Sequence, residues 1–134
     1  AWASRHIRRE LISRWAAGGF AQIRGLEVGA CSSPLAPPVW MDMVYVDLSA
    51  RAKINCVGQD NRKRVNIIDD AETLASQRNE SWDLVVASHV LEHIPGTLSA
   101  IESWLRVLRP GGVCIFMVPD MCQTDDRYRL PTRA

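Results

Sequence analysis

The sequence predicts an α/β domain built on a doubly wound (Rossmann-like), mostly parallel sheet of about five strands, with helices on both faces. Short apolar runs rich in β-branched residues recur along the chain, and each is too short to form a helix. Stretches with helical spacing or capping signals separate these runs. Strands that alternate with helices pair in parallel through right-handed crossovers, and their sheet is covered on both sides.

The expected strands cover residues 23–28, 43–46, 65–68, 84–87 and 113–118. Helical segments are expected at residues 5–16, from about residue 34, at 50–57, at 71–77 and at 98–108. The segment 98–108 has the clearest pattern, and the sequence RPGG that follows it is typical of a helix end. Its apolar face carries Leu98, Ile101, Leu105 and Leu108. We expect this face to lie against the sheet.

The length, charge and cysteine pattern of the chain exclude several classes of protein. The chain has 134 residues, enough for one domain, and its 16 basic and 15 acidic residues give a formal net charge of +1. This balance lacks the basic field of proteins that bind nucleic acid or membrane surfaces, and no apolar run approaches the ~20 residues of a membrane span. The cysteines show neither metal-ligand spacing nor a preceding signal peptide. We expect reduced thiols, a cytoplasmic protein and a small-molecule partner.

In doubly wound sheets, ligands bind at the carboxyl ends of the strands, near the point where the strand order reverses. The first strand is followed by Gly29 and a run of small residues, which allow the backbone to approach a ligand closely. The second strand ends at Asp47, where a carboxylate can accept both hydroxyls of a ribose. After the third strand, one of Asp69 and Asp70 can accept from an adenine amino group while the other caps the next helix. These positions predict a nucleoside ligand.

Two further motifs link this arrangement to a known family. They are WDLVVASHVLEHI at residues 82–94 and LRVLRPGG at residues 105–112. With the strand ends described above, the chain resembles the class I S-adenosylmethionine-dependent methyltransferases, particularly the small-molecule type 11 group, over residues 23–119. We therefore expect a single domain that consists of a leading amphipathic helix at 1–22, this cofactor-binding core and a tail at 120–134.

The resemblance implies a role for each strand end. Glu27 and Gly29 would lie at the methionine end of S-adenosylmethionine, and Asp47 would lie on its ribose. Asp70 and Ala71 would lie near adenine. The residues implied on the sulfonium side are Ser88 and His89.

Methyl transfer to a hydroxyl or amine also requires removal of a proton. His89 is the candidate base because it follows the fourth strand, although a capping or packing role is the alternative there. His93, one helical turn further on, is expected to pack structurally, as are Trp82 and Trp104.

The resemblance also implies strands beyond the fifth, and only residues 119–134 follow it here. We therefore expect the sheet to lack its C-terminal strands, poor turnover by this form, and an exposed sheet edge that favours homo-oligomers. The predicted function is methyl transfer to a small-molecule acceptor. The alternatives are a non-catalytic remnant or partner subunit on the same scaffold and a nicotinamide-dependent oxidoreductase, which the absence of G-x-G-x-x-G disfavours.

Overall fold

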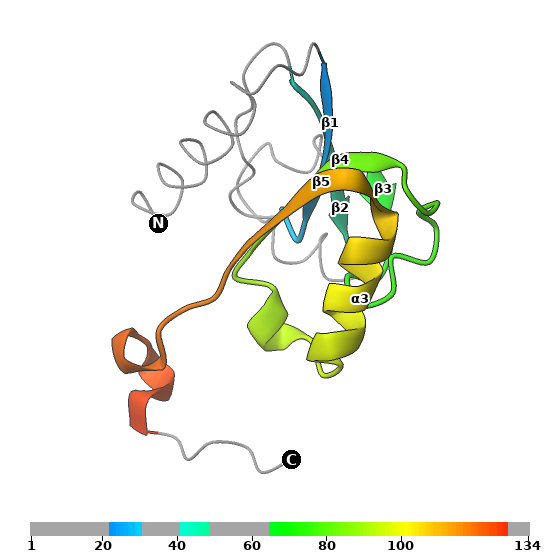
Figure 1. The fold of residues 1–134 in the computed structure, drawn as a ribbon. Coiled ribbons are helices and arrows are strands. Elements are labelled where there is room, and N and C mark those ends of the chain that lie inside the picture. Colours follow the sequence, from blue (N-terminus) through cyan, green and yellow to red (C-terminus); the bar gives the residue numbers. More distant parts are fainter. Residues whose placement is uncertain (1–21, 31–40, 49–64, 129–134) are drawn as a thin grey trace.

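The computed structural model describes residues 22–30, 41–48 and 65–128, which form one parallel sheet, the chain between its last three strands in sequence and the segment after the last of them (Figure 1). Its five strands lie in the order β3-β2-β1-β4-β5, and every neighbouring pair is parallel. The bounds are Ile23–Val28 for β1, Met41–Asp47 for β2, Ile67–Ile68 for β3, Trp82–Ser88 for β4 and Leu108–Met117 for β5. The chain builds outward from β1 to β3 and then returns to the other side of β1. This order confirms the predicted doubly wound α/β fold.

The described helices follow β4 and β5. The chain from β4 to β5 forms η2 (Leu91–His93) and α3 (Thr97–Val107), and η3 (Met121–Gln123) and η4 (Asp125–Tyr128) follow β5. No helix in this part of the chain has the length and apolar character that crossing a membrane requires. The helices expected at 5–16, near residue 34 and at 50–57 lie outside the described residues.

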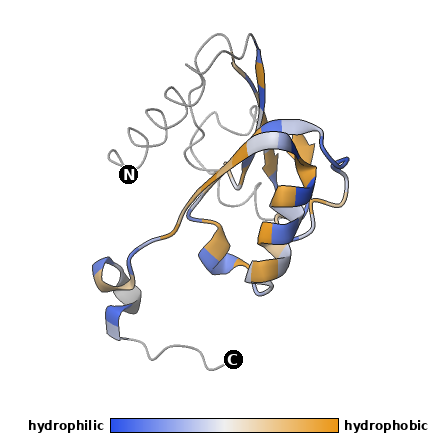
Figure 2. Cartoon of the chain, in the orientation of Figure 1, coloured by the Kyte–Doolittle hydropathy of each residue, from blue (hydrophilic) through white to orange (hydrophobic). Residues whose placement is uncertain are grey.

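Apolar side chains from both faces of the sheet form the core, and the strands are correspondingly hydrophobic in Figure 2. Successive strand residues point to opposite faces, so Val85 and Val86 of β4 belong to different clusters, and both are fully buried. The cluster on the α3 side includes Leu26, Val28, Val46, Val85, Trp104 and Val107. The cluster on the other face includes Ile23, Met43, Tyr45, Leu84 and Val86.

Helix α3 forms where the sequence predicts it, but it presents a different face to the sheet. Ala100, Trp104 and Val107 are buried, whereas Leu98 and Leu105 are 77% and 57% exposed. The prediction that Leu98, Ile101, Leu105 and Leu108 share an inward face is therefore wrong: Ile101 is only partly buried, and Leu108 is buried as the first residue of β5. The buried residues recur at the same helical spacing, and the large Trp104 side chain removes more apolar area from water than a leucine does.

The helix expected at residues 71–77 does not form, and residues 69–80 instead make a series of turns after β3. The backbone is left-handed at the buried Leu74, where φ is 43°, which interrupts any helix there. Asp69 also accepts from the backbone N–H and the hydroxyl of Ser76, at 3.0 and 2.6 Å. Side-chain acceptors of this kind compete with helical hydrogen bonds, so the contacts between Asp69 and Ser76 stabilise turns in this segment.

Arg106 of α3 attaches this loop to the rest of the domain. Its guanidinium donates to the carbonyl oxygens of Thr73, Leu74 and Gln77 at 2.9–3.1 Å and to Asn79 Oδ1 at 2.7 Å. The planar fork of an arginine can satisfy several acceptors at once, so one side chain fixes the loop between β3 and β4.

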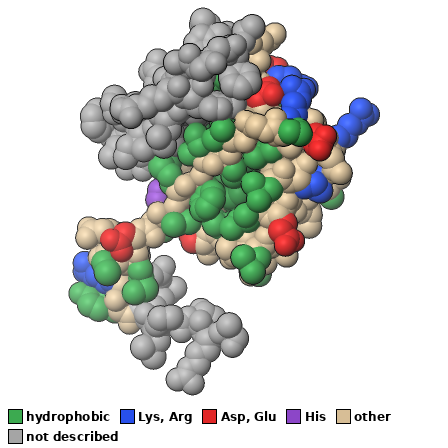
Figure 3. Space-filling model, in the orientation of Figure 1, with side chains coloured by type: hydrophobic (Ala, Val, Ile, Leu, Met, Phe, Trp, Pro, Cys, Tyr) green, Lys and Arg blue, Asp and Glu red, His purple; other side chains and the backbone are tan. Residues whose placement is uncertain are grey.

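Strand β5 begins five residues earlier than predicted, because Leu108 and the RPGG sequence after it already belong to the strand. A β-carbon on Gly112 would crowd the carbonyl oxygens of Arg109 and Asp83, so a side chain there would require adjustment of its surroundings. Among the described residues β5 pairs only with β4, so it is an edge strand. Hydrophobic side chains gather over β5 and α3 in Figure 3, and those that are exposed include Leu98, Leu105, Phe116 and Val118.

Candidate functional site

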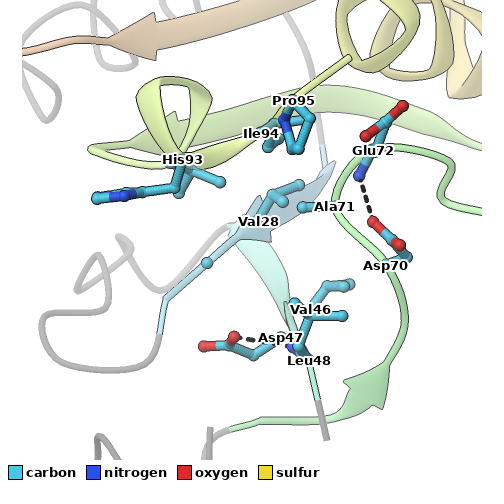
Figure 4. Close-up of a pocket in the computed structure, with 12 residues that line it drawn as sticks. Val28, Val46, Asp47, Leu48, Asp70, Ala71, Glu72, His93, Ile94 and Pro95 are labelled. Carbon is cyan, nitrogen blue, oxygen red and sulfur yellow. Dashed lines mark hydrogen bonds between the residues drawn. The ribbon is translucent and has the colours of Figure 1, made fainter. Parts of the chain in front are cut away.

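A cavity of about 420 Å³ lies at the carboxyl ends of the strands, where the strand order reverses between β1 and β4 (Figure 4). Its walls come from the ends of β1 and β2, from the loop after β3 and from the segment after β4. The lining residues are Val28, Gly29, Val46, Asp47, Leu48, Asp70, Ala71, Glu72, Val90, His93, Ile94 and Pro95. The structure therefore brings Gly29, Asp47, Asp70 and Ala71 together, as the sequence predicts.

Gly29 brings the loop after β1 against the segment after β4. Its backbone is left-handed, with φ of 70°, and its N–H donates to the Val46 carbonyl at 2.9 Å. A β-carbon at this position would collide with a methyl group of Val90. Only glycine allows both the backbone conformation and the close approach.

Asp47 is the last residue of β2, and its side chain is partly buried at the cavity. Its Oδ1 accepts from the backbone N–H of Leu48 at 2.8 Å, which fixes the carboxylate against its own backbone (Figure 4). In the parallel register Asp47 pairs with Ile68, so the acidic residues after β3 follow beside it. The carboxylates of Asp47 and Asp70 thus reach the cavity from the ends of neighbouring strands.

The two acidic residues after β3 have different surroundings. Asp69 Oδ2 accepts from Ser76, and its Oδ1 accepts from the Asp70 N–H at 2.8 Å. Partial burial raises the pKa of Asp69, but these hydrogen bonds to the carboxylate outweigh it and hold the pKa below the ordinary value. Asp70 instead lines the cavity, and its Oδ1 accepts from the Glu72 N–H at 2.8 Å. Asp69 stabilises the loop, and Asp70 is the carboxylate available to a ligand.

The loop that carries Asp70 and Ala71 is attached to the chain after β4 at two further points. The indole Nε1 of the fully buried Trp104 donates to the Ala71 carbonyl at 2.8 Å. Glu72 Oε2 accepts from the Gly96 N–H at 3.3 Å, and a β-carbon on Gly96 would collide with this carboxylate. These contacts fix one side of the cavity against α3.

Glu27, Ser88 and His89 are at strand ends as predicted, but they are not among the residues that line this cavity. Glu27 is only 2% exposed, in β1 beside Val86 of β4. Ser88 is the last residue of β4. His89 follows it with a left-handed backbone, φ 56°, and its N–H donates to the Met117 carbonyl at 2.9 Å. Its exposed imidazole lies with Nδ1 3.5 Å from Glu92 Oε1.

His93 lines the cavity although the sequence gives it a packing role. Its side chain is 76% exposed, and Nε2 lies 3.9 Å from the same Glu92 oxygen. The expectation of structural packing is therefore wrong, because η2 buries Leu91 and leaves the His93 side chain exposed. Its place one turn beyond the fourth strand is the signal that could have identified it.

The apolar walls of the cavity were also not predicted. Val28, Val46, Val90 and Ile94 flank the polar groups, and each stands within a few residues of a strand end. Apolar walls with a few oriented polar groups are typical of small-molecule sites. The two carboxylates at separate strand ends can accept from hydroxyl and amino groups of one extended ligand.

Comparison with known proteins points in the same direction. A family model described as a methyltransferase domain matches residues 26–116. A ubiquinone biosynthesis O-methyltransferase of Pseudomonas fluorescens is 39% identical over 46 residues, which make up 34% of this chain and 20% of that protein. The chain thus spans a minor part of the curated relatives it matches.

Two solved structures have a similar fold. The CurJ carbon methyltransferase matches 84% of this chain and 34% of its own length, with a TM-score of 0.65 and 17% identity. The trans-methyltransferase CalH, in complex with SAH, matches 81% of this chain and 35% of its own length, with a TM-score of 0.59 and 19% identity. At these identities the likeness concerns the fold.

Proposed function

Because the chain belongs to the family of S-adenosylmethionine-dependent methyltransferase domains, we propose that its cavity binds S-adenosylmethionine and that the whole protein methylates a small organic acceptor. One observation carries the proposal. Asp47 and Asp70 reach one cavity from neighbouring strand ends, and the next strand contributes a glycine, Gly29, that no other residue can replace without strain. These two acceptors fit the hydroxyl and amino groups of a nucleoside.

The residues at the cavity fit the parts of the cofactor as follows. Asp47 accepts from the ribose hydroxyls, because a carboxylate at the end of the second strand suits a vicinal diol. Asp70, with Ala71, faces adenine and accepts from its amino group. Gly29 lets the backbone approach the methionine portion, near which Glu27 lies at the end of the same strand.

Bound S-adenosylmethionine would supply an electrophilic methyl group on a sulfonium. The residues of this chain would align the acceptor, exclude water and accept a proton. Ser88 and His89, at the end of β4, are proposed to face the sulfonium side, with His89 as the proton acceptor. His93 is the rival for that role, because it lines the cavity and its imidazole is held near the same glutamate as that of His89.

A small-molecule acceptor is supported by the names of the similar proteins, which include O-methyltransferases of ubiquinone biosynthesis. A cytoplasmic location is proposed from the cysteine pattern of the sequence. We also propose self-association through the β5 edge, since that strand pairs only with β4 among the described residues and exposed apolar side chains surround it.

Methyl transfer by the whole protein tests the proposed activity. The assay supplies S-adenosylmethionine with a panel of hydroxyl, amine and carboxylate acceptors and compares His89→Ala with His93→Ala. Loss of turnover in His89→Ala, with unchanged cofactor affinity, supports His89 as the proton acceptor, and the same result in His93→Ala assigns the role to His93. Cofactor binding without methyl transfer to any class of acceptor would favour the non-catalytic alternative.

A further inference from the structure

A chain of polar contacts leads from the buried core to the cavity through a single peptide group. The Ala71 carbonyl accepts from Trp104 Nε1 at 2.8 Å, and the Glu72 N–H donates to Asp70 Oδ1, also at 2.8 Å. Carbonyl and N–H belong to the same peptide bond, and no cis peptide occurs in the described residues. In a trans peptide the two groups point in opposite directions, so fixing the carbonyl also fixes the direction of the N–H.

The buried end of this chain is rigid. Trp104 is fully buried in the core, where its ring lies 6.1 Å from that of Phe116. The indole ring has a single donor, its N–H, and no acceptor. The direction of this N–H is therefore set by the packing of the ring. The donor to the Ala71 carbonyl is therefore fixed in the packed core, and a movement of the loop would break this hydrogen bond.

The cavity end of this chain is the Asp70 carboxylate. Figure 4 shows Asp70 joined to the Glu72 nitrogen beside Ala71 at the cavity wall. Asp69 fixes the Asp70 N–H from the other side, at 2.8 Å. With its backbone and Oδ1 both held, Asp70 can present Oδ2 to a ligand in one orientation.

We infer that Trp104 is a positioning residue for ligand recognition: through the Ala71–Glu72 peptide group it sets the orientation in which Asp70 reads the base of the bound nucleoside. This inference rests on the proposed function. It adds that specificity for the base amino group depends on a core indole N–H that does not touch the ligand. The predicted consequence is a loss of discrimination between bases, beyond any uniform loss of affinity.

The test compares two ligands on the same protein by calorimetry, S-adenosylhomocysteine and S-inosylhomocysteine. The inosine analogue carries a carbonyl in place of the adenine amino group, so at that position it offers Asp70 an acceptor instead of a donor. The wild-type protein should prefer S-adenosylhomocysteine by about 10- to 100-fold, as expected for a hydrogen bond to a charged acceptor. Trp104→Phe keeps an apolar ring and removes the donor, and it should reduce that preference roughly 3- to 10-fold.

Trp82→Phe is the matched control. Trp82 is also a buried tryptophan, and its Nε1 has no hydrogen-bond partner among the described residues. It starts β4, at the end of the strand far from the cavity. Trp82→Phe should leave the ratio of the two affinities at the wild-type value, even if Trp82→Phe and Trp104→Phe lose similar amounts of stability.

Three results would overturn the inference, and they are distinguishable. A wild-type ratio near one means that Asp70 does not read the base, although the proposed cofactor stands. An unchanged ratio in Trp104→Phe means that the indole N–H does not position Asp70. Absence of S-adenosylhomocysteine binding by the wild-type protein removes the proposed function itself. If Trp104→Phe does not fold, 3-benzothienylalanine at position 104 replaces only the N–H by sulfur, and the same ratio decides.

Discussion

The position of the β-carbon that Gly29 lacks is occupied by a methyl group of Val90, so the loop after β1 touches the segment after β4 without a side chain between them. Gly29 also has a left-handed backbone. Gly29→Ala should therefore lower the free energy of unfolding by about 1–2 kcal/mol through backbone strain and by about 1–3 kcal/mol more through overpacking. Chemical denaturation measures the change.

Gly111→Ala is the control for strain alone. Gly111 has φ of 82°, but a β-carbon added there would meet no atom within 4 Å. This variant should lose only about 1–2 kcal/mol and keep its affinity for S-adenosylhomocysteine. Equal losses of stability and of affinity in the two variants would contradict the role given to Val90.

Asp69 should make stability depend on acid pH. Because its pKa is lower in the folded protein than in the unfolded chain, its contribution is fully present above the unfolded value, near 4. The contribution is lost as the pH falls through the lower, folded value. Unfolding measured from pH 6 to pH 2 should show this loss in the wild-type protein. The loss should be smaller in Ser76→Ala and absent in Asp69→Asn, and identical pH profiles would refute the assignment.

Arg106 should contribute more to the stability of the fold than Arg109, which also contacts a side-chain oxygen near the end of α3. Arg106→Lys leaves several loop carbonyls without their donor and should cost about 1–3 kcal/mol. Arg109 forms a partly exposed ion pair with Asp83 at 3.0 Å, and Arg109→Lys should cost less than about 1 kcal/mol. Thermal unfolding of the two variants side by side decides the order.

Self-association through the exposed apolar surface of β5 and α3 predicts that a charge there disperses the oligomer. Leu105 is 57% exposed on α3, and Leu105→Lys should shift the sedimentation profile toward the monomer. Ser99→Lys places the same charge at another exposed position of α3 and should leave the profile unchanged. A monomeric wild-type protein at every concentration would remove this part of the proposal.

The sequence predicts the sheet and the polar part of the cavity because both follow from periodicity. Parallel strands place their carboxyl ends at one edge, so Gly29, Asp47 and Asp70 had to meet there once the strands were recognised. The choice between Asp69 and Asp70 could not be made in this way, since it depends on the Ser76 contacts of a loop with no repeating pattern.

The errors have a common cause in tertiary contacts. Two stripes of α3 have helical spacing, and the buried one was selected by the packing of Trp104 and its bond to Ala71. Residues 71–77 have a plausible helical composition, but the turn at Leu74 and the Arg106 contacts favour a loop. Sequence periodicity cannot report a partner that lies about 30 residues away in the chain.

Calorimetry with S-adenosylhomocysteine, and with NAD as the competing ligand, tests whether the cavity binds S-adenosylmethionine. We expect saturable binding of S-adenosylhomocysteine and none of NAD. Asp47→Ala should weaken binding by about 1–3 kcal/mol, because a buried ribose hydroxyl loses its acceptor. Asp42→Ala removes an exposed carboxylate at the opposite end of β2 and should not change the affinity. Binding of NAD in place of S-adenosylhomocysteine, or equal affinities in the two variants, would contradict an S-adenosylmethionine site at Asp47.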